Sequence, residues 1–188
     1  MDDKDSPPLS GQDNPEKSPL STPPKGEDLK EAKDKPALKI SKRIFVVTCT
    51  KESLTREVMD CLKKNCLEYV LSFDRAYSTL SIEQKFIQNP GIQFAIVSLS
   101  GDEFVYPKEG KYQSAKLRAK QDIVFELGFL VGKLGRQNVF VLYHEQKSFL
   151  LPTNFLHVLY YPHDEKGRWK DELLKRLKTA GFALRDNV

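Results

Sequence analysis

A glutamate and an aspartate lie one turn apart on the most apolar helical segment of this chain. Residues 119–136 read AKQDIVFELGFLVGKLGR, and a period of 3.6 residues places Ile123 and Leu127 on one side, with Glu126 at its margin and Asp122 one turn earlier. Two like charges at this spacing cost about 0.2–0.5 kcal/mol, and partial burial of a carboxylate costs more. Glu126 is therefore either paired with a lysine or arginine, or a catalytic carboxylate at the edge of a cleft.

Three glycines occur in the same helical segment. Gly128 and Gly132 each cost roughly 1 kcal/mol inside a helix, unless another backbone or a ligand must come close to them. Gly135 is expected to end the helix. The helix itself is expected to start between Ser114 and Ala119.

The rest of the folded sequence alternates apolar runs with amphipathic segments. We expect strands at 43–49, 67–73, 93–99, 138–143 and 157–161, and further helices at 52–65, 81–88 and 168–180. The expected N-caps are Thr50 or Ser53 for the first of these helices, and Ser78, Thr79 or Ser81 for the second. Residues 100–112 are expected to form a polar loop.

The strands are apolar throughout rather than at every second residue, which indicates a parallel sheet covered by helices on both faces. Five such strands predict an α/β, flavodoxin-like sheet of order 2-1-3-4-5. Ligands in such sheets bind beyond the carboxyl ends of the strands, near the switch point between strands 1 and 3. The predicted floor of the cleft is therefore 48–53, 73–79 and 98–103, and the helix that carries Glu126 leaves from that edge.

The first forty of the 188 residues differ in composition from the rest. They hold seven of the eleven prolines and no aromatic residue, so we expect a disordered tail at 1–39 and one folded domain at 40–188. The tail contains nine acidic residues and seven lysines, so the net charge of +4 comes from the rest of the chain. The lysines and arginines there are scattered among acids, which makes nucleic acid an unlikely partner.

Several other classes of protein are disfavoured. The chain has neither a secretory apolar region nor a run of eighteen apolar residues, so we expect a cytoplasmic protein without a membrane partner. Cys49, Cys61 and Cys66 lack a Cys-x-x-Cys pair and are expected to be reduced packing residues. The three histidines show no ligand spacing, so no metal site is expected. Dinucleotide-binding G-x-G-x-x-G, Walker A and G-x-S-x-G motifs do not occur.

Four stretches carry a resemblance that goes further than these patterns. They are RIFVV at 43–47, QFAIVSLSGDE at 93–103, QDIVFELGFLVGKLGR at 121–136 and VLYYPHDEKGRWKDELLKRLKTAGF at 158–182. Together they resemble the prokaryotic TIR-like predicted nucleotide-binding family, whose members occur alone or fused to cyclic-dinucleotide sensors such as bacterial STING.

The resemblance implies an activity. In active members of the family a glutamate on the third helix cleaves the nicotinamide–ribose bond of NAD, and Glu126 occupies that position here. The chain is then expected to be a NAD nucleosidase in a defence response, with NAD as substrate and with no cofactor or metal. It is expected to be activated by self-association, with the trigger coming either from a partner such as a separate sensor protein or from the N-terminal tail.

The resemblance and the predicted cleft together give a set of ligand-binding residues. We expect the substrate to be contacted by the following side chains: Thr48, Thr50, Phe73, Ser100, Asp102 and Asp122. Tyr77 is a second aromatic candidate for stacking on a base. Thr48 and Cys49 stand where many members carry His-Gly, and Asp122 where they usually carry Asn, so the loop that faces the ligand differs in shape and donors.

Two other functions are compatible with the same residues. One is a non-catalytic nucleotide-binding or scaffold module, in which the helix of Glu126 mediates packing between TIR domains. The other is an enzyme similar to nucleoside deoxyribosyltransferases, which also break an N-glycosidic bond with a glutamate.

Overall fold

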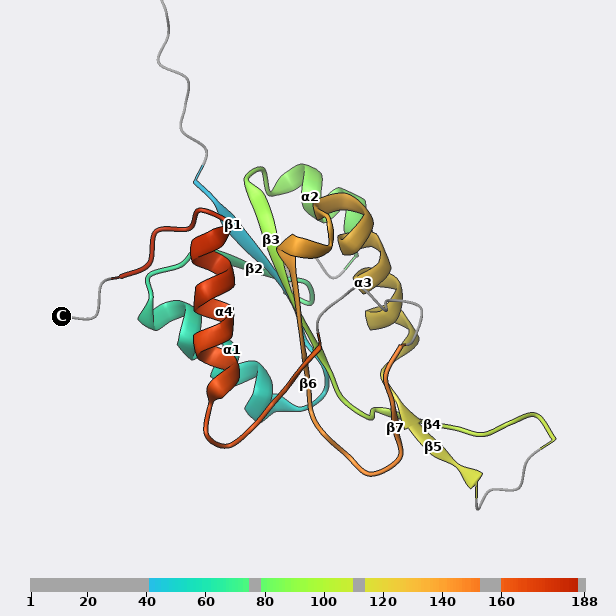
Figure 1. The fold of residues 1–188 in the computed structure, drawn as a ribbon. Helices are drawn as coiled ribbons and strands as arrows, with labels where there is room; N and C mark the ends of the chain where they lie inside the picture. Colours follow the sequence, from blue (N-terminus) through green and yellow to red (C-terminus); the bar gives the residue numbers. More distant parts are fainter. Residues whose placement is uncertain (1–40, 75–78, 110–113, 153–159, 186–188) are drawn as a thin grey trace, which may run out of the picture. The chain divides into compact units, whose positions relative to one another are not determined.

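The protein is represented by a computed structural model that describes residues 41–74, 79–109, 114–152 and 160–185 (Figure 1). The tail predicted at 1–39 and the candidate aromatic Tyr77 lie outside the described residues. The division into a tail and a domain therefore stays a prediction.

The central sheet has the predicted order. Its strands are β1 (Arg43–Val47), β2 (Tyr69–Leu71), β3 (Ile92–Leu99), β6 (Val139–Tyr143) and β8 (Tyr160–Pro162), arranged as β2-β1-β3-β6-β8. Each neighbouring pair is parallel, as the apolar runs predicted. The first part of the fifth predicted strand, 157–159, lies outside the described residues.

Helices cover both faces of this sheet, which confirms the α/β prediction. α1 (Glu52–Lys64) and α4 (Arg168–Thr179) lie on one face, and α2 (Ile82–Gln88) and α3 (Gln121–Leu134) on the other (Figure 1). Parallel strands buried from both sides need apolar residues at every position, and Ile44 to Val47 of β1 are all buried.

The two predicted N-caps differ in outcome. Ser81 caps α2 with a capping box, in which its side chain accepts from the Gln84 amide and the Gln84 side chain accepts from the Ser81 amide. The cap predicted for α1 is wrong, because α1 follows Lys51 and has no side-chain cap. The candidate Thr50 hydroxyl instead donates to Asp102.

A second, smaller sheet lies where the sequence predicts a loop and a longer helix. β4 (Glu103–Val105), β5 (Lys116–Arg118) and β7 (Phe149–Leu150) form a sheet of order β4-β5-β7, whose β4–β5 pair extends from the rest of the domain in Figure 1. β4 interrupts the loop expected at 100–112, and β5 prevents α3 from starting before Gln121. Strands of two or three residues carry too little periodicity to be recognised in a sequence.

The buried side of α3 is the predicted one, and its glycines differ in role. Ile123, Leu127 and Leu130 are buried. Gly135 ends the helix with φ at +78°, a conformation that favours glycine. No backbone among the described residues comes close to Gly132, because a Cβ there would meet nothing within 4 Å.

Two of the three predicted packing cysteines are buried. Cys49 and Cys61 lie in the core and all three thiols are free. Cys66 is exposed, in the turn that follows α1, and its φ of +55° shows that its position is set by the turn rather than by packing. The packing role expected for Cys66 is therefore wrong.

Candidate active site

Glu126 projects from α3 toward α2, where it has a basic partner and borders a cavity. Its Oε1 atom lies 3.7 Å from the Nζ atom of Lys85, so it has a basic partner. The Glu126 side chain nevertheless retains 18% of its exposure, against 10% for Lys85. A carboxylate in this position is paired and still accessible to a small ligand.

The surroundings of Glu126 shift its protonation equilibrium. Burial raises the pKa of the Glu126 carboxyl above its ordinary value, and the nearby charge of Asp122 adds to that increase. The Lys85 ammonium and a hydrogen bond from the Ser72 hydroxyl favour the ionised form and partly oppose the increase. A raised pKa makes this carboxylate a stronger base than one in water.

A cavity of about 310 Å³ opens beside this carboxylate. Its lining comes from the ends of β1 and β2, from α2, and from the start of α3: Val47, Thr48, Ser72, Phe73, Lys85, Lys120, Asp122, Ile123 and Glu126. Carboxylate, ammonium and hydroxyl groups thus converge on one hollow at the carboxyl edge of the sheet, where parallel α/β sheets bind ligands.

A larger cavity of about 660 Å³ adjoins the first one along α1. Four residues line both hollows: Thr48, Phe73, Lys120 and Ile123. The shared residues place the two cavities next to each other, and the two together are the opening at this edge of the sheet.

Four of the predicted site residues line the cavity of Glu126 or its junction with the larger cavity. Asp122 and Glu126 line the smaller cavity, and Thr48 and Phe73 line both. Phe73 is 57% exposed, which leaves its ring free to stack on a planar group. Thr50 lines the larger cavity only.

Ser100 and Asp102, which were expected to contact the substrate, take part in hydrogen bonds between two turns. The Ser100 and Thr50 hydroxyls both donate to Oδ1 of Asp102, which ties the turn after β3 to the turn after β1. Neither Ser100 nor Asp102 is among the residues that line the two cavities, and Ser100 is buried. These hydrogen bonds join the two turns, and contact of Ser100 and Asp102 with a ligand stays a prediction.

Sequence reasoning missed the basic residues of the opening. Lys85 is the most informative one, because it is buried on the side of α2 that also buries Ile82, three residues earlier. A lysine at an apolar position of a helix signals a buried acidic partner. Lys120 and Arg56, which line the larger cavity, carry no comparable signal in the sequence.

The described residues contain no group of three or more His, Cys, Asp or Glu side chains that could hold a metal ion. Among the same residues, no helix combines the length and apolar character needed to cross a membrane.

One of the comparisons with known proteins gives a family. The family model described as CAP12/Pycsar effector protein, TIR domain, matches residues 43–165, which include β1 and all of α3. The uncharacterized protein YuaY of Escherichia coli (strain K12) is 33% identical over 143 residues, which cover 76% of this chain and 46% of that protein. The chain thus spans less than half the length of this relative.

Among solved structures, a mutant of the flavo di-iron protein from Thermotoga maritima is similar to this chain at 13% identity and a TM-score of 0.44. The similarity covers 75% of this chain and 36% of that protein.

Proposed function

The chain belongs to the family of CAP12/Pycsar effector TIR domains, and from that premise we propose that it cleaves the nicotinamide–ribose bond of NAD with the carboxylate of Glu126. The single observation that supports this best is the position of Glu126. Its carboxylate is partly buried, has a raised pKa, and lines a cavity at the carboxyl edge of the sheet.

The chemistry requires a carboxylate at this position. The bond between the ribose C1′ atom and the nicotinamide nitrogen breaks, and the bonding electrons leave with neutral nicotinamide. The positive charge that develops on the ribose is stabilised by the Glu126 carboxylate, as in glycoside cleavage. Water then forms the new bond to C1′, and its proton passes to Glu126 and on to solvent, which gives ADP-ribose.

The neighbours of Glu126 support this role in distinct ways. Lys85, 3.7 Å from Oε1, favours the ionised form of the carboxylate and so opposes the effect of its burial. Asp122 adds negative potential at the same cavity, and the exposed ring of Phe73 offers a stacking surface for nicotinamide. NAD is an intracellular metabolite, so the proposal places the reaction in the cytoplasm.

The test is to incubate the full chain at high concentration with NAD and to follow nicotinamide and ADP-ribose by chromatography. Glu126→Gln removes the charge at nearly constant volume and should lower the rate at least about 100-fold, the order typical for loss of a group that stabilises transition-state charge. The matched control is Glu165→Gln, an exposed glutamate in the turn before α4. Equal rates in wild type and Glu126→Gln would reject the role of this carboxylate.

The same assay separates the alternatives. Transfer of the sugar to a second base when deoxynucleosides are supplied would favour a deoxyribosyltransferase. The absence of nicotinamide release at high protein concentration and under crowding would favour a non-catalytic scaffold.

Self-association on activation is part of the proposal, in the context of an anti-phage defence response. It is supported by two exposed apolar side chains on the helices that carry the ion pair, Phe125 on α3 at 67% and Ile87 on α2 at 79%. Exposed large apolar groups on neighbouring helices are typical of protein contacts. Sedimentation velocity should show less assembly for Phe125→Ser than for the control Lys133→Ser, and equal assembly would exclude this surface.

A further inference from the structure

The larger of the two cavities is built along one side of α1. Six of its twelve lining residues come from this helix: Glu52, Thr55, Arg56, Met59, Asp60 and Lys63. Their spacing of three to four residues places them on one face, which extends roughly 16 Å along the helix axis. The cavity is therefore long enough for a group larger than a single sugar, and it shares four lining residues with the cavity of Glu126.

Three basic side chains line the larger cavity: Arg56, Lys63 and Lys120. Within the described part of the chain, Arg56, Lys63 and Lys120 form no ion pair, whereas Lys85 and Lys170 are each paired with a glutamate. The acidic members of the lining are Glu52 and Asp60, so cations outnumber acids there. Unpaired basic side chains at a cavity favour an anionic ligand, and arginine fits a phosphate with two parallel hydrogen bonds.

Hydrogen-bond donors lie on the same side of α1. The Thr55 hydroxyl oxygen is buried and has no hydrogen-bond partner among the described residues, although Thr55 lines the cavity. The first turn of α1 has no side-chain cap, so its amide groups are not satisfied by a capping side chain. Amides of this kind add to a phosphate site that other groups define.

We propose that this cavity binds the diphosphate of a nucleoside diphosphate, with Arg56 and Lys63 contacting the phosphate oxygens. Lys120 lies at the junction of the two cavities, where the diphosphate would continue toward the ribose that reacts. The inference rests on the proposed function in one respect, namely that the bound nucleotide is the ADP-ribose half of NAD. It goes beyond that function by assigning the residues that distinguish a dinucleotide from a nucleoside.

The inference is tested by titrating the full chain with ADP and with AMP in a calorimeter, without any turnover. The wild type should bind ADP more tightly than AMP. The double variant Arg56→Ala/Lys63→Ala should bind ADP at least about tenfold more weakly, because two charge-assisted contacts are lost, and should lose the preference for ADP. Asp60→Asn, which removes a repelling charge, should tighten ADP binding.

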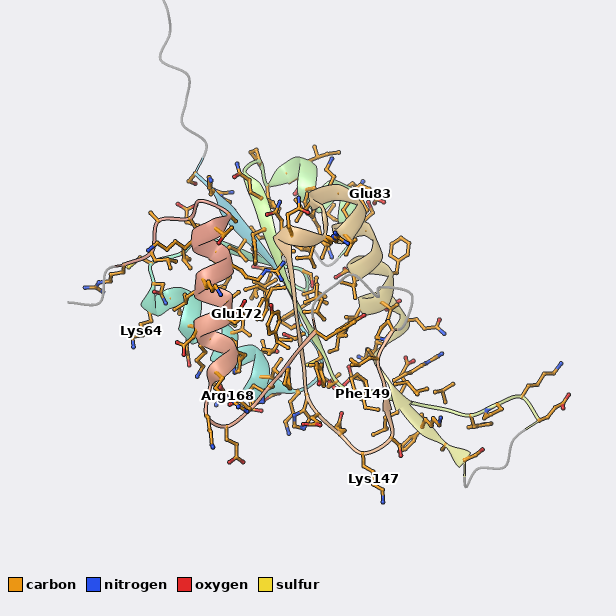
Figure 2. All side chains as sticks on the ribbon, in the orientation of Figure 1. Lys64, Glu83, Lys147, Phe149, Arg168 and Glu172 are labelled. Atoms are coloured by element: carbon orange, nitrogen blue, oxygen red, sulfur yellow. The ribbon has the colours of Figure 1, made fainter. Side chains whose placement is uncertain are left out.

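The control is Lys64→Ala/Lys178→Ala, which removes two positive charges from exposed positions that do not line the cavity. The Lys64 side chain extends from α1 away from the sheet in Figure 2. This control should bind ADP as the wild type does. Thermal melts verify that each variant is folded. If the Arg56→Ala/Lys63→Ala variant is not folded, the Asp60→Asn variant decides the question. Tighter ADP binding by Asp60→Asn supports the phosphate site, and unchanged ADP binding overturns it.

The remaining outcomes separate this inference from the proposed function. The phosphate site is overturned if the wild type does not bind ADP, even if the protein releases nicotinamide. It is also overturned if Arg56→Ala/Lys63→Ala and Lys64→Ala/Lys178→Ala bind ADP equally well. ADP binding that depends on Arg56 and Lys63, in a protein that releases no nicotinamide, supports the site and rejects the enzyme.

Discussion

Lys85 and Glu126 form an ion pair between two helices on the same face of the sheet, with 3.7 Å between Nζ and Oε1. The rings of Phe86 and Phe129, on the same two helices, meet edge to face with centroids 5.5 Å apart and hold α2 against α3. Glu126 also lines a cavity. Because the packing of α2 against α3 sets the distance from Lys85 to Glu126, it also influences the ionisation of the Glu126 carboxylate. Lys85 is therefore expected to act on the reaction through Glu126.

Replacing Lys85 by methionine should shift the acid limb of kcat/KM to higher pH. Burial already raises the pKa of Glu126, the cation lowers it, and Asp122 and Ser72 remain in place in the variant. Without the cation a smaller fraction of Glu126 is ionised at a given pH. The pKa is measured directly by NMR titration of the Glu126 carboxyl carbon.

Lys85→Arg keeps the charge and should restore most of the wild-type profile. A carboxyl titration that is the same in Lys85→Met and wild type would show that the ion pair has no influence on the charge of Glu126.

Glu126→Gln should raise the thermal stability of the protein at neutral pH. The pKa of Glu126 is higher in the folded state than in the unfolded state, so the folded state binds the carboxyl proton more tightly. The protein therefore loses stability as the pH rises from the pKa of the unfolded state through the pKa of the folded state. A neutral isostere avoids that loss. The gap in Tm between variant and wild type should therefore be largest at neutral pH and shrink below the ordinary carboxyl pKa.

The gap is obtained from calorimetric melts at several pH values. Glu165→Gln, at an exposed position, serves as the control for removing one negative charge. A gap that grows as the pH falls would contradict the raised pKa.

Gly132→Ala should stabilise the protein by about 0.5–1 kcal/mol, because alanine is the better helix former and the added Cβ meets only open space. The contrasting change is Gly135→Ala, which should destabilise it, since Gly135 has φ at +78°. Both free energies of unfolding come from urea titrations. A loss of stability in Gly132→Ala would indicate that this surface of α3 is covered in solution.

Asp102→Ala should lower the free energy of unfolding by about 1–3 kcal/mol, because it leaves the Ser100 and Thr50 hydroxyls without their common acceptor. Asp102→Asn keeps an acceptor oxygen and should lose less. Urea unfolding measures both. Equal stability of wild type and Asp102→Ala would mean that solvent replaces these bonds at no cost.

The sheet and its helices were predictable because their signals are local. The continuous apolar runs of β1, β3 and β6 and the 3.6-residue period of α1, α3 and α4 are properties of adjacent residues. The end of α3 at Gly135 follows from one residue type. The small β4-β5-β7 sheet was missed because strands so short owe their existence to pairing with distant segments rather than to their own sequence.

The candidate site, like the fold, was only partly predictable from the sequence. By itself, the sequence determined a parallel α/β sheet and a glutamate at the apolar margin of its third long helix, because periodicity fixes which residues share a face. Only the tertiary structure decided that this glutamate meets both Lys85 and a cavity, and that Arg56 and Lys63 line the continuation of that cavity. These groups come from different elements, and the distances between them depend on how the helices pack on the sheet, which no local pattern encodes.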